Sequence, residues 1–458
     1  MLVRFLALGL TLLCLRAIWS GWGTFAAPSP AVPATLRALD LPAVPLADED
    51  GATDQVIRYL EDRLRSDPEN YRAYSKLAGY HLQRLRETGN VQYLGLALGA
   101  ARHSLAVIPE ARNIGGLTVL AQAELAAHDF AAARDHAGRL TALDPDKSLP
   151  YGILGDALLE LGAYEEANEA FRQMAARGQS VVTETRLARL SWLRGDTDPA
   201  QRHLFTALAL ALDAPAPPRE TVAWCRWQFG EMAFAAGDYE TAERHYRAAL
   251  TTFPGYTNAL ASLGRVRAAR GDLAGAIERY QEAVRRLPDP AFVAALGDLH
   301  RLAGRERDAA TQYALVEQIG HLSAASGAPY NRQLALYYAD HDLKAEEAYA
   351  SAAREYEVRR DVYGADAVAW TALKAGHLAA AQGAMQEALR LGTPDARLYY
   401  HAGMIARSVG EGAAARGYLQ RALALNPQFD PLQAPIARQA LEQLTPAVTS
   451  AAVPTAPR

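Results

Sequence analysis

The sequence predicts an all-α fold, a solenoid in which antiparallel helix pairs stack along the chain. A pattern of small, aromatic and proline residues recurs, for instance from Gly230 to Gly264, a step of 34 residues. No segment shows the alternation of apolar and polar residues that is typical of a half-buried strand. Hydrophobic residues make up 50% of the chain and charged residues 21%, which indicates a folded protein without multiple membrane spans.

Each unit is defined by residues at fixed offsets from a glycine. The full pattern occurs at Gly230, Gly237, Ala242, Tyr246 and Pro254, at Gly264, Gly271, Ala276, Tyr280 and Pro288, and, with a leucine in place of the tyrosine, at Gly403, Gly410, Ala415, Leu419 and Pro427. Forms without the proline begin at Gly155 and Gly297, and weaker or degenerate copies contain Ala78, Ala121, Ala188, Ala335 and Ala369. About ten units result, more than the three or so that a solenoid needs.

The residues of the pattern explain how one unit folds. A first helix ends at a glycine such as Gly237, which can adopt the left-handed conformation that stops a helix. Gly230 and Ala242 allow the first and second helices to approach closely, and Tyr246 fills the space between them. Pro254 ends the second helix. No unit buries its apolar face alone, so neighbouring units must stack.

This pattern resembles the tetratricopeptide repeat family over roughly Asp54 to Leu444. The resemblance implies a right-handed superhelix, with the first helices lining a concave groove that binds a protein or peptide partner, and Pro431 to Leu444 as a final capping helix. Members that grip C-terminal carboxylates use a lysine and an asparagine in the first unit. The equivalents in this chain are Ser75 and Gly79, so that activity is not expected.

The two ends of the chain differ from the repeats. Residues 1–26 are typical of an export signal cleaved before Ala27, or of an uncleaved membrane anchor, and residues 27–51 are expected to form a Pro-rich linker. Residues 52–444 then form the solenoid, and residues 445–458 are expected to be a disordered tail. The protein is accordingly expected to be bacterial and exported, either periplasmic or extracellular, or else anchored to the membrane by its N-terminal segment.

One helical stripe in the middle of the array is the candidate partner-binding site. Trp224, Trp227, Glu231 and Phe234 follow each other at spacings of three, four and three residues, which places them on one face of one helix. In the repeat register that face lines the groove. Arg189 and Trp192 of the preceding unit and Arg265 of the following unit complete the candidate site, because aromatic and arginine side chains dominate binding hot spots.

Two other interpretations of this stripe remain open. The proline loop at residues 214–218 is long enough to fold over Trp224 and Trp227 and cover them. The stripe also belongs to a series of charges with alternating sign at equivalent repeat positions, which predicts an intramolecular charge ladder rather than a binding site. The series consists of Asp156, Arg189, Glu231, Arg265 and Asp298.

The sequence carries no recognised motif for catalysis or cofactor binding. The sequence contains no phosphate-binding loop, no dinucleotide-binding glycine pattern, no HExxH zinc motif and no nucleophile elbow. His341, between two aspartates, is expected to lie in a solvated turn rather than in a metal site, and Cys225 is expected to be a buried structural thiol rather than a redox switch. The net charge of -4 argues against nucleic-acid binding.

The sequence therefore predicts a non-enzymatic scaffold with no cofactor, no metal and no catalytic residue. Its partner would be a protein or peptide, and the membrane would be contacted only through the N-terminal segment. An accessory subunit of an envelope enzyme or transporter, or an enzyme with an unrecognised site, is the alternative.

Overall fold

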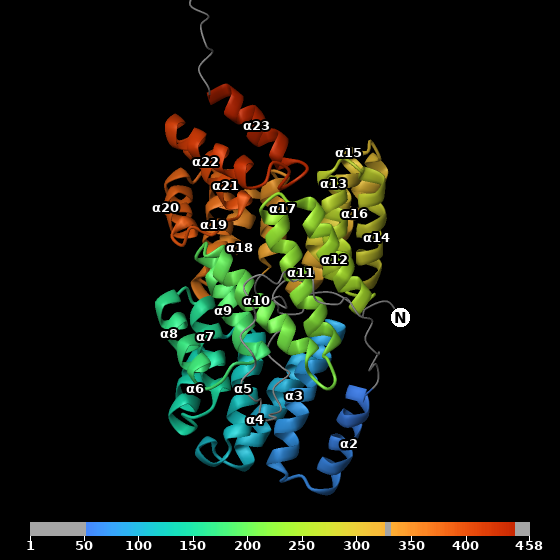
Figure 1. Cartoon of the computed structure of the whole chain (residues 1–458), viewed down its shortest axis with the longest axis vertical. Helices are drawn as coiled ribbons and strands as arrows, with labels where there is room; N and C mark the ends of the chain where they lie inside the picture. Colours follow the sequence, from blue (N-terminus) through green and yellow to red (C-terminus); the bar gives the residue numbers. More distant parts are fainter. Residues whose placement is uncertain (1–51, 326–330, 445–458) are drawn as a thin grey trace, which may run out of the picture.

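The computed structural model describes residues 52–325 and 331–444, which form 22 α-helices, one short 3-10 helix and no strand. Within these residues, α3 to α22 are ten consecutive pairs, and the second helix of each pair packs against the first (Figure 1). The predicted fold class, an all-α solenoid of antiparallel helix pairs, is confirmed. The expectations for residues 1–26, 27–51 and 445–458 concern segments outside the described residues.

The helix boundaries follow the repeat pattern. The first helices of the pairs are α3 (Tyr71–Thr88), α5 (Ile114–Ala126), α7 (Ser148–Glu160), α9 (Val181–Leu193), α11 (Arg219–Ala235), α13 (Thr257–Ala269), α15 (Pro290–Leu302), α17 (Arg332–Asp340), α19 (Val362–Lys374) and α21 (Ala396–Ser408). The second helices are α4 (Gln92–Val107), α6 (Phe130–Leu143), α8 (Tyr164–Ala176), α10 (Thr197–Leu212), α12 (Tyr239–Thr252), α14 (Leu273–Arg286), α16 (Glu306–Ala325), α18 (Ala345–Val358), α20 (Leu378–Leu389) and α22 (Gly412–Leu425). Outside the pairs lie α2 (Ala52–Ser66), the 3-10 helix η2 (Glu110–Arg112) and α23 (Gln433–Leu444).

The turn inside each pair has the backbone that the sequence predicts. Gly237 and Gly271 have φ values of 74° and 81°, in the left-handed region where a side chain is strained. His128, which replaces the glycine in an earlier repeat, adopts the same conformation with φ 62°. The turn therefore requires this backbone even where the residue is not glycine.

Close helix packing explains the small residue in the middle of each first helix. A Cβ atom added at Gly264 would lie 2.6 Å from the ring of Tyr280, and one at Gly403 would lie 2.7 Å from the side chain of Leu419. Gly230 faces the ring of Tyr246 in the same way. The expected close approach, filled by a large side chain from the second helix, is confirmed.

The array curves back onto itself. Helices α7 to α9 in the middle of the chain lie beside the loops around α18 to α21 (Figure 1). The Thr393 hydroxyl donates to the carbonyl of Leu193, and the Val362 amide donates to the Tyr164 hydroxyl. These partners are 200 and 198 residues apart in the sequence. We call this contact between successive superhelical turns the seam.

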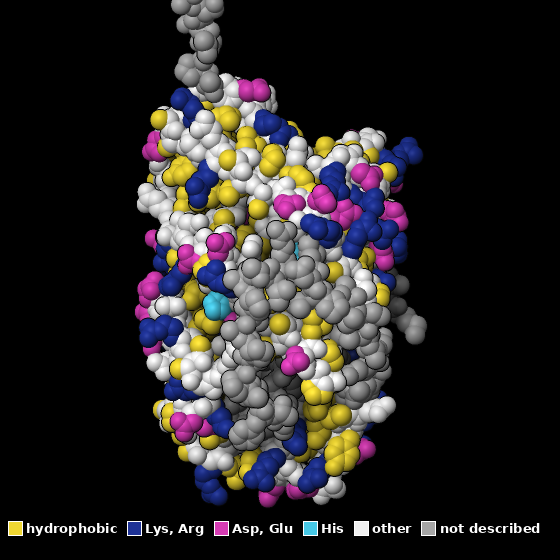
Figure 2. Space-filling model, in the orientation of Figure 1, with side chains coloured by type: hydrophobic (Ala, Val, Ile, Leu, Met, Phe, Trp, Pro, Cys, Tyr) yellow, Lys and Arg dark blue, Asp and Glu magenta, His cyan; other side chains and the backbone are white. Residues whose placement is uncertain are grey.

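None of the helices in residues 52–325 and 331–444 is long and apolar enough to cross a bilayer. Basic and acidic side chains are interspersed over the face in Figure 2 rather than gathered by sign. Ion pairs between neighbouring helices occur among the described residues, such as Arg270 with Glu243 at 2.5 Å.

Candidate functional site

The three aromatic residues of the α11 stripe lie in the hydrophobic core. Trp224 and Trp227 are each 6% exposed and Phe234 is 5% exposed. The expectation that Trp227 is an exposed anchor is therefore wrong. The covering residues come from the following repeat: Tyr256 meets the Trp227 ring edge-on at a centroid distance of 6.3 Å, and the Ser262 hydroxyl accepts the indole N–H at 2.9 Å.

Glu231 is the centre of a polar network that includes the other predicted residues. Its carboxylate accepts hydrogen bonds from the Tyr246 hydroxyl at 2.7 Å and from the Ser262 hydroxyl at 2.9 Å. Arg265 donates to both of its oxygens at 2.6 and 2.7 Å, and the guanidinium lies 4.1 Å from the Phe234 ring centre. Burial would lower the pKa of Arg265, but the Glu231 carboxylate raises it above the ordinary value. For this pair the charge-ladder interpretation is supported.

Arg189 and Trp192 on α9 take separate roles. Trp192 is half-buried and packs against the cluster that contains Trp224 and Trp227. Arg189 instead donates to Glu160 at 2.7 Å, in the seam. Arg189 and Arg265 therefore pair with different carboxylates, and that they border one patch stays a prediction. The charge-ladder interpretation is not supported at Asp156. The ladder predicts Arg189 as its partner, but Asp156 pairs with the buried Arg186, which lies one helical turn before Arg189. That any of these residues binds a partner stays a prediction.

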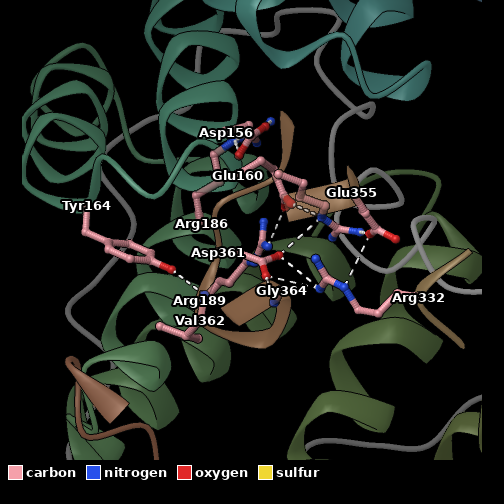
Figure 3. Close-up of polar contacts among 11 residues, drawn as sticks. Asp156, Glu160, Tyr164, Arg186, Arg189, Arg332, Glu355, Asp361, Val362 and Gly364 are labelled. Carbon is pink, nitrogen blue, oxygen red and sulfur yellow. Dashed lines mark hydrogen bonds and ion pairs between the residues drawn. The ribbon is translucent and has the colours of Figure 1, made fainter. Parts of the chain in front are cut away.

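The seam contains a buried ionic network (Figure 3). Glu160, at the end of α7, accepts from Arg189 and from Arg359, the latter at 2.6 Å. Arg359 lies 3.2 Å from Asp361, whose carboxylate is also 3.1 Å from Arg332. Burial would raise the pKa of Glu160, but Arg359 and Arg189 hold it well below its usual range. The network therefore keeps Glu160 ionised and joins α7 and α9 to the start of α17 and α19.

A second group of charges is more accessible and acts electrostatically on Tyr280. The Arg397 side chain is 41% exposed and lies 3.3 Å from Asp430, while Arg265, 32% exposed, pairs with Glu231. Burial raises the pKa of Tyr280 to about 12, and the charges of all four residues act on it. The two ion pairs come from distant repeats, on α11 and α13 and at α21 and α23. We call these five residues the Tyr280 cluster.

Sequence reasoning missed two members of this cluster, although one left a signal. Arg397 stands six residues before Gly403, the same repeat position that Trp224 occupies before Gly230. That position is expected to face the groove, so the repeat register alone marks Arg397 as a candidate groove residue. Asp430 lies in the loop before α23, outside the repeat pattern, and nothing in the sequence distinguishes it from other loop aspartates.

His341 lies at the end of α17, as expected, but it is not solvated. Its side chain is 8% exposed, its Nε2 lies 2.8 Å from an Asp298 carboxylate oxygen, and its Nδ1 lies 2.8 Å from the Tyr337 carbonyl. Burial opposes protonation, yet the Asp298 carboxylate raises the pKa of His341 above its usual value. In residues 52–325 and 331–444, no three His, Cys, Asp or Glu side chains are grouped as a metal ion would require.

We expect Cys225 to be unreactive in the native protein. It is fully buried, and burial raises its pKa to about 12, so almost no thiolate forms at neutral pH. In a Cys14→Ser background, dithiobis(nitrobenzoate) should react at least ~100-fold more slowly with the native protein than with the protein in guanidinium. Equal rates in the two conditions would contradict the structural role and favour a redox switch. Cys225→Ala, which lacks the thiol, supplies the blank.

Comparison with known proteins identifies the repeat. Family models for the tetratricopeptide repeat match residues 118–181, 233–299 and 367–428. The first match covers α5 to α8, the second reaches from the end of α11 to α15, and the third covers α19 to α22. These three segments of the chain therefore match the tetratricopeptide repeat. No curated protein matches the sequence.

Several solved structures share similarity with the chain. PilW, described as a widely conserved type IV pilus biogenesis factor, is 19% identical with a TM-score of 0.37, over 48% of this chain and 94% of its own. Human IFIT1, solved as a dimer with PPP-AAAA, is 12% identical with a TM-score of 0.42, over 85% of this chain and 98% of its own. YrrB, described as a tetratricopeptide repeat protein with an unusual peptide-binding site, is 19% identical with a TM-score of 0.29, over 42% and 95% respectively.

Proposed function

We propose that this protein is a non-enzymatic scaffold whose repeat array binds a protein or peptide partner. The observation that carries the proposal is the Tyr280 cluster, in which two partly exposed ion pairs from distant repeats act electrostatically on the same tyrosine. An arginine can grip a carboxylate or a main-chain carbonyl of a partner through more than one hydrogen bond. Arg397 is the most exposed member of the cluster, and we assign it the main contact.

Charge reversal at Arg397 tests this assignment. The full-length chain is immobilised, incubated with extract from its native cells, and the captured proteins are identified and titrated. Arg397→Glu should weaken binding of a specifically captured partner by at least tenfold, about 1.4 kcal/mol, because it places a carboxylate beside Asp430. Arg397→Lys should lose less, and raising the salt concentration should reduce the difference.

The matched control is Arg172→Glu. Arg172 lies on the second helix α8, is 67% exposed and pairs with Glu169 on its own helix. The control should keep the affinity of the unmodified protein. The proposal fails if Arg397→Glu and Arg172→Glu retain the same partners with the same affinity while both remain folded.

We further propose that the scaffold is bacterial and is exported, with residues 1–26 acting as a cleaved signal and residues 27–51 as a linker. The support is the charged start, the short apolar run and the small residues before Ala27. N-terminal sequencing of protein from the cell envelope should begin near Ala27. An intact Met1 in the membrane fraction would favour the anchor, and intact protein in the cytoplasm would overturn both interpretations.

An accessory role for an envelope enzyme or transporter is the second candidate. It shares the binding surface with the first and differs in what the partner does. The identity of the captured partner separates the two, because an accessory subunit should copurify in fixed proportion with a catalytic or transport protein.

A further inference from the structure

The seam repeats the same contact at three successive helix pairs. The turn glycines Gly162, Gly195 and Gly237 lie against the loops that precede α19, α21 and α23, respectively. A Cβ added at Gly195 would lie 3.0 Å from the carbonyl oxygen of Gly392, and one at Gly237 would lie 3.3 Å from Pro427. Gly162 faces the carbonyl of Arg360 more closely still.

Four other turns of the array make no such contact, whereas a Cβ added at Gly89 would lie 3.5 Å from the distant Leu287. Gly271, Gly304, Gly376 and Gly410 have the same positive φ, between 71° and 84°, yet nothing lies within 4 Å of an added Cβ atom. The contact is therefore not a property of the turn itself. It arises only where one superhelical turn meets the next.

At each of these three turns, the opposing loop also supplies a hydrogen-bond donor to a carbonyl near the end of a first helix. Arg390 donates to the Gly162 carbonyl at 2.7 Å and Thr393 donates to the Leu193 carbonyl at 2.6 Å. The Asn426 amide donates to the Phe234 carbonyl at 2.7 Å. The last carbonyls of a helix lack partners within the helix, so a loop from a distant repeat here acts as a C-terminal cap.

Apolar packing and a buried ion pair accompany the contacts at Gly162 and Gly195. One hydrophobic cluster contains Leu159, Tyr164, Leu190 and Leu193 from the middle repeats together with Val362, Tyr363 and Leu391 from the C-terminal repeats. Beside it lies the pair formed by Glu160 and Arg359. The seam thus combines an apolar cluster with hydrogen bonds and buried ion pairs.

We propose that the seam is a clasp, which holds the superhelix closed and couples repeats about 200 residues apart into one cooperative unit. In a simple solenoid each repeat contacts only its neighbours, and a local defect spreads only to adjacent repeats. The clasp adds contacts between α7–α11 and the loops before α19, α21 and α23. A defect on one side of the clasp therefore loosens the other side. This inference goes beyond the proposed function and does not depend on it.

Alanine substitution at two turn glycines tests the clasp. Gly162→Ala and Gly271→Ala introduce the same backbone strain, because φ is 74° and 81°. Only the first displaces the Arg360 carbonyl. By hydrogen exchange, Gly162→Ala should accelerate amides in both 148–193 and 362–396 by at least tenfold. Gly271→Ala should accelerate amides only within 257–302.

The distance between two spin labels reports directly whether the clasp is closed. Labels at the exposed residues Glu165 and Arg360, in a chain with Cys14→Ser and Cys225→Ala, should give one narrow distance distribution. Gly162→Ala should broaden it toward longer distances, whereas Gly271→Ala should not. An unchanged distribution in Gly162→Ala, or exchange that accelerates only around its own repeat, would overturn the clasp.

Thr393→Val provides a milder variant in case Gly162→Ala fails to fold. It removes the donor to the Leu193 carbonyl and keeps the side-chain shape. Exchange should again accelerate on both sides of the clasp, by a few-fold. Thr251→Val is the control, since the exposed Thr251 hydroxyl donates to the Arg247 carbonyl on its own helix. Equal exchange in the two threonine variants would also overturn the proposal.

Discussion

Replacing Glu160 with glutamine is expected to lower the free energy of unfolding by about 3–5 kcal/mol, the usual cost of removing one member of a buried ion pair. The Glu160 side chain is 5% exposed and accepts from two arginines, Arg189 and Arg359. Glutamine keeps the size of the side chain but not its charge, so both guanidinium groups lose a carboxylate. The midpoint of chemical denaturation, followed by circular dichroism, measures the loss.

The matched control is Glu165→Gln, which makes the same chemical change five residues away. Glu165 is 82% exposed and pairs with Arg194 at the surface. Exposed ion pairs contribute about 0–1 kcal/mol, so the free energy of unfolding of this variant should be close to that of the unmodified protein. Equal destabilisation by the two substitutions would contradict the role given to the buried network.

The effect of Glu160 should also depend on pH in a defined direction. Its pKa in the folded protein lies well below that of an unfolded glutamate, about 4.3. The stabilisation is therefore fully present above that value and is lost as the pH falls toward the folded pKa. The difference between the unmodified protein and Glu160→Gln should be constant from neutral pH to about 5 and should shrink in stronger acid. A difference that grew on acidification would contradict this sign.

The helix pairs are predictable because each unit is a local structure. The glycine at the turn, the small residue in the first helix and the large residue that faces it lie within one repeat, as at Gly264, Gly271 and Tyr280. Their chemistry is therefore visible as a pattern in the sequence. The positive φ of His128 shows the same requirement where the pattern residue itself is missing.

The seam is not predictable in this way, because its partners are set by the curvature and pitch of the whole array. Glu160 and Arg359 are 199 residues apart, and nothing near either residue indicates the other. Small rotations between repeats accumulate over the intervening helices and determine which loop meets which turn. Arg189 differs, because its partner Glu160 lies only 29 residues away, on the first helix of the preceding repeat.

The candidate site was only partly predictable, for a related reason. Repeat register places Trp227 and Glu231 on one face of α11, and the structure does bring Glu231, Phe234 and Arg265 together. The repeat register does not predict whether side chains of the neighbouring repeat cover that face. Tyr256, at the start of the next first helix, meets the Trp227 ring and changes a possible anchor into a core residue.

Trp227→Ala is accordingly expected to destabilise the protein by about 3–5 kcal/mol, the range for truncating a buried aromatic side chain. It removes the edge contact with Tyr256, leaves a cavity between α11 and α13, and takes away the N–H that binds Ser262. Trp192→Ala, at a half-buried position on the margin of the same cluster, should cost about 1 kcal/mol. Trp227→Phe keeps most of the apolar contact, so its loss of stability should lie between those of the two alanine variants. Chemical denaturation of the three variants measures these differences. If Trp227→Ala left stability unchanged but abolished capture of a partner, the exposed-anchor hypothesis would be restored and the core position of Trp227 contradicted.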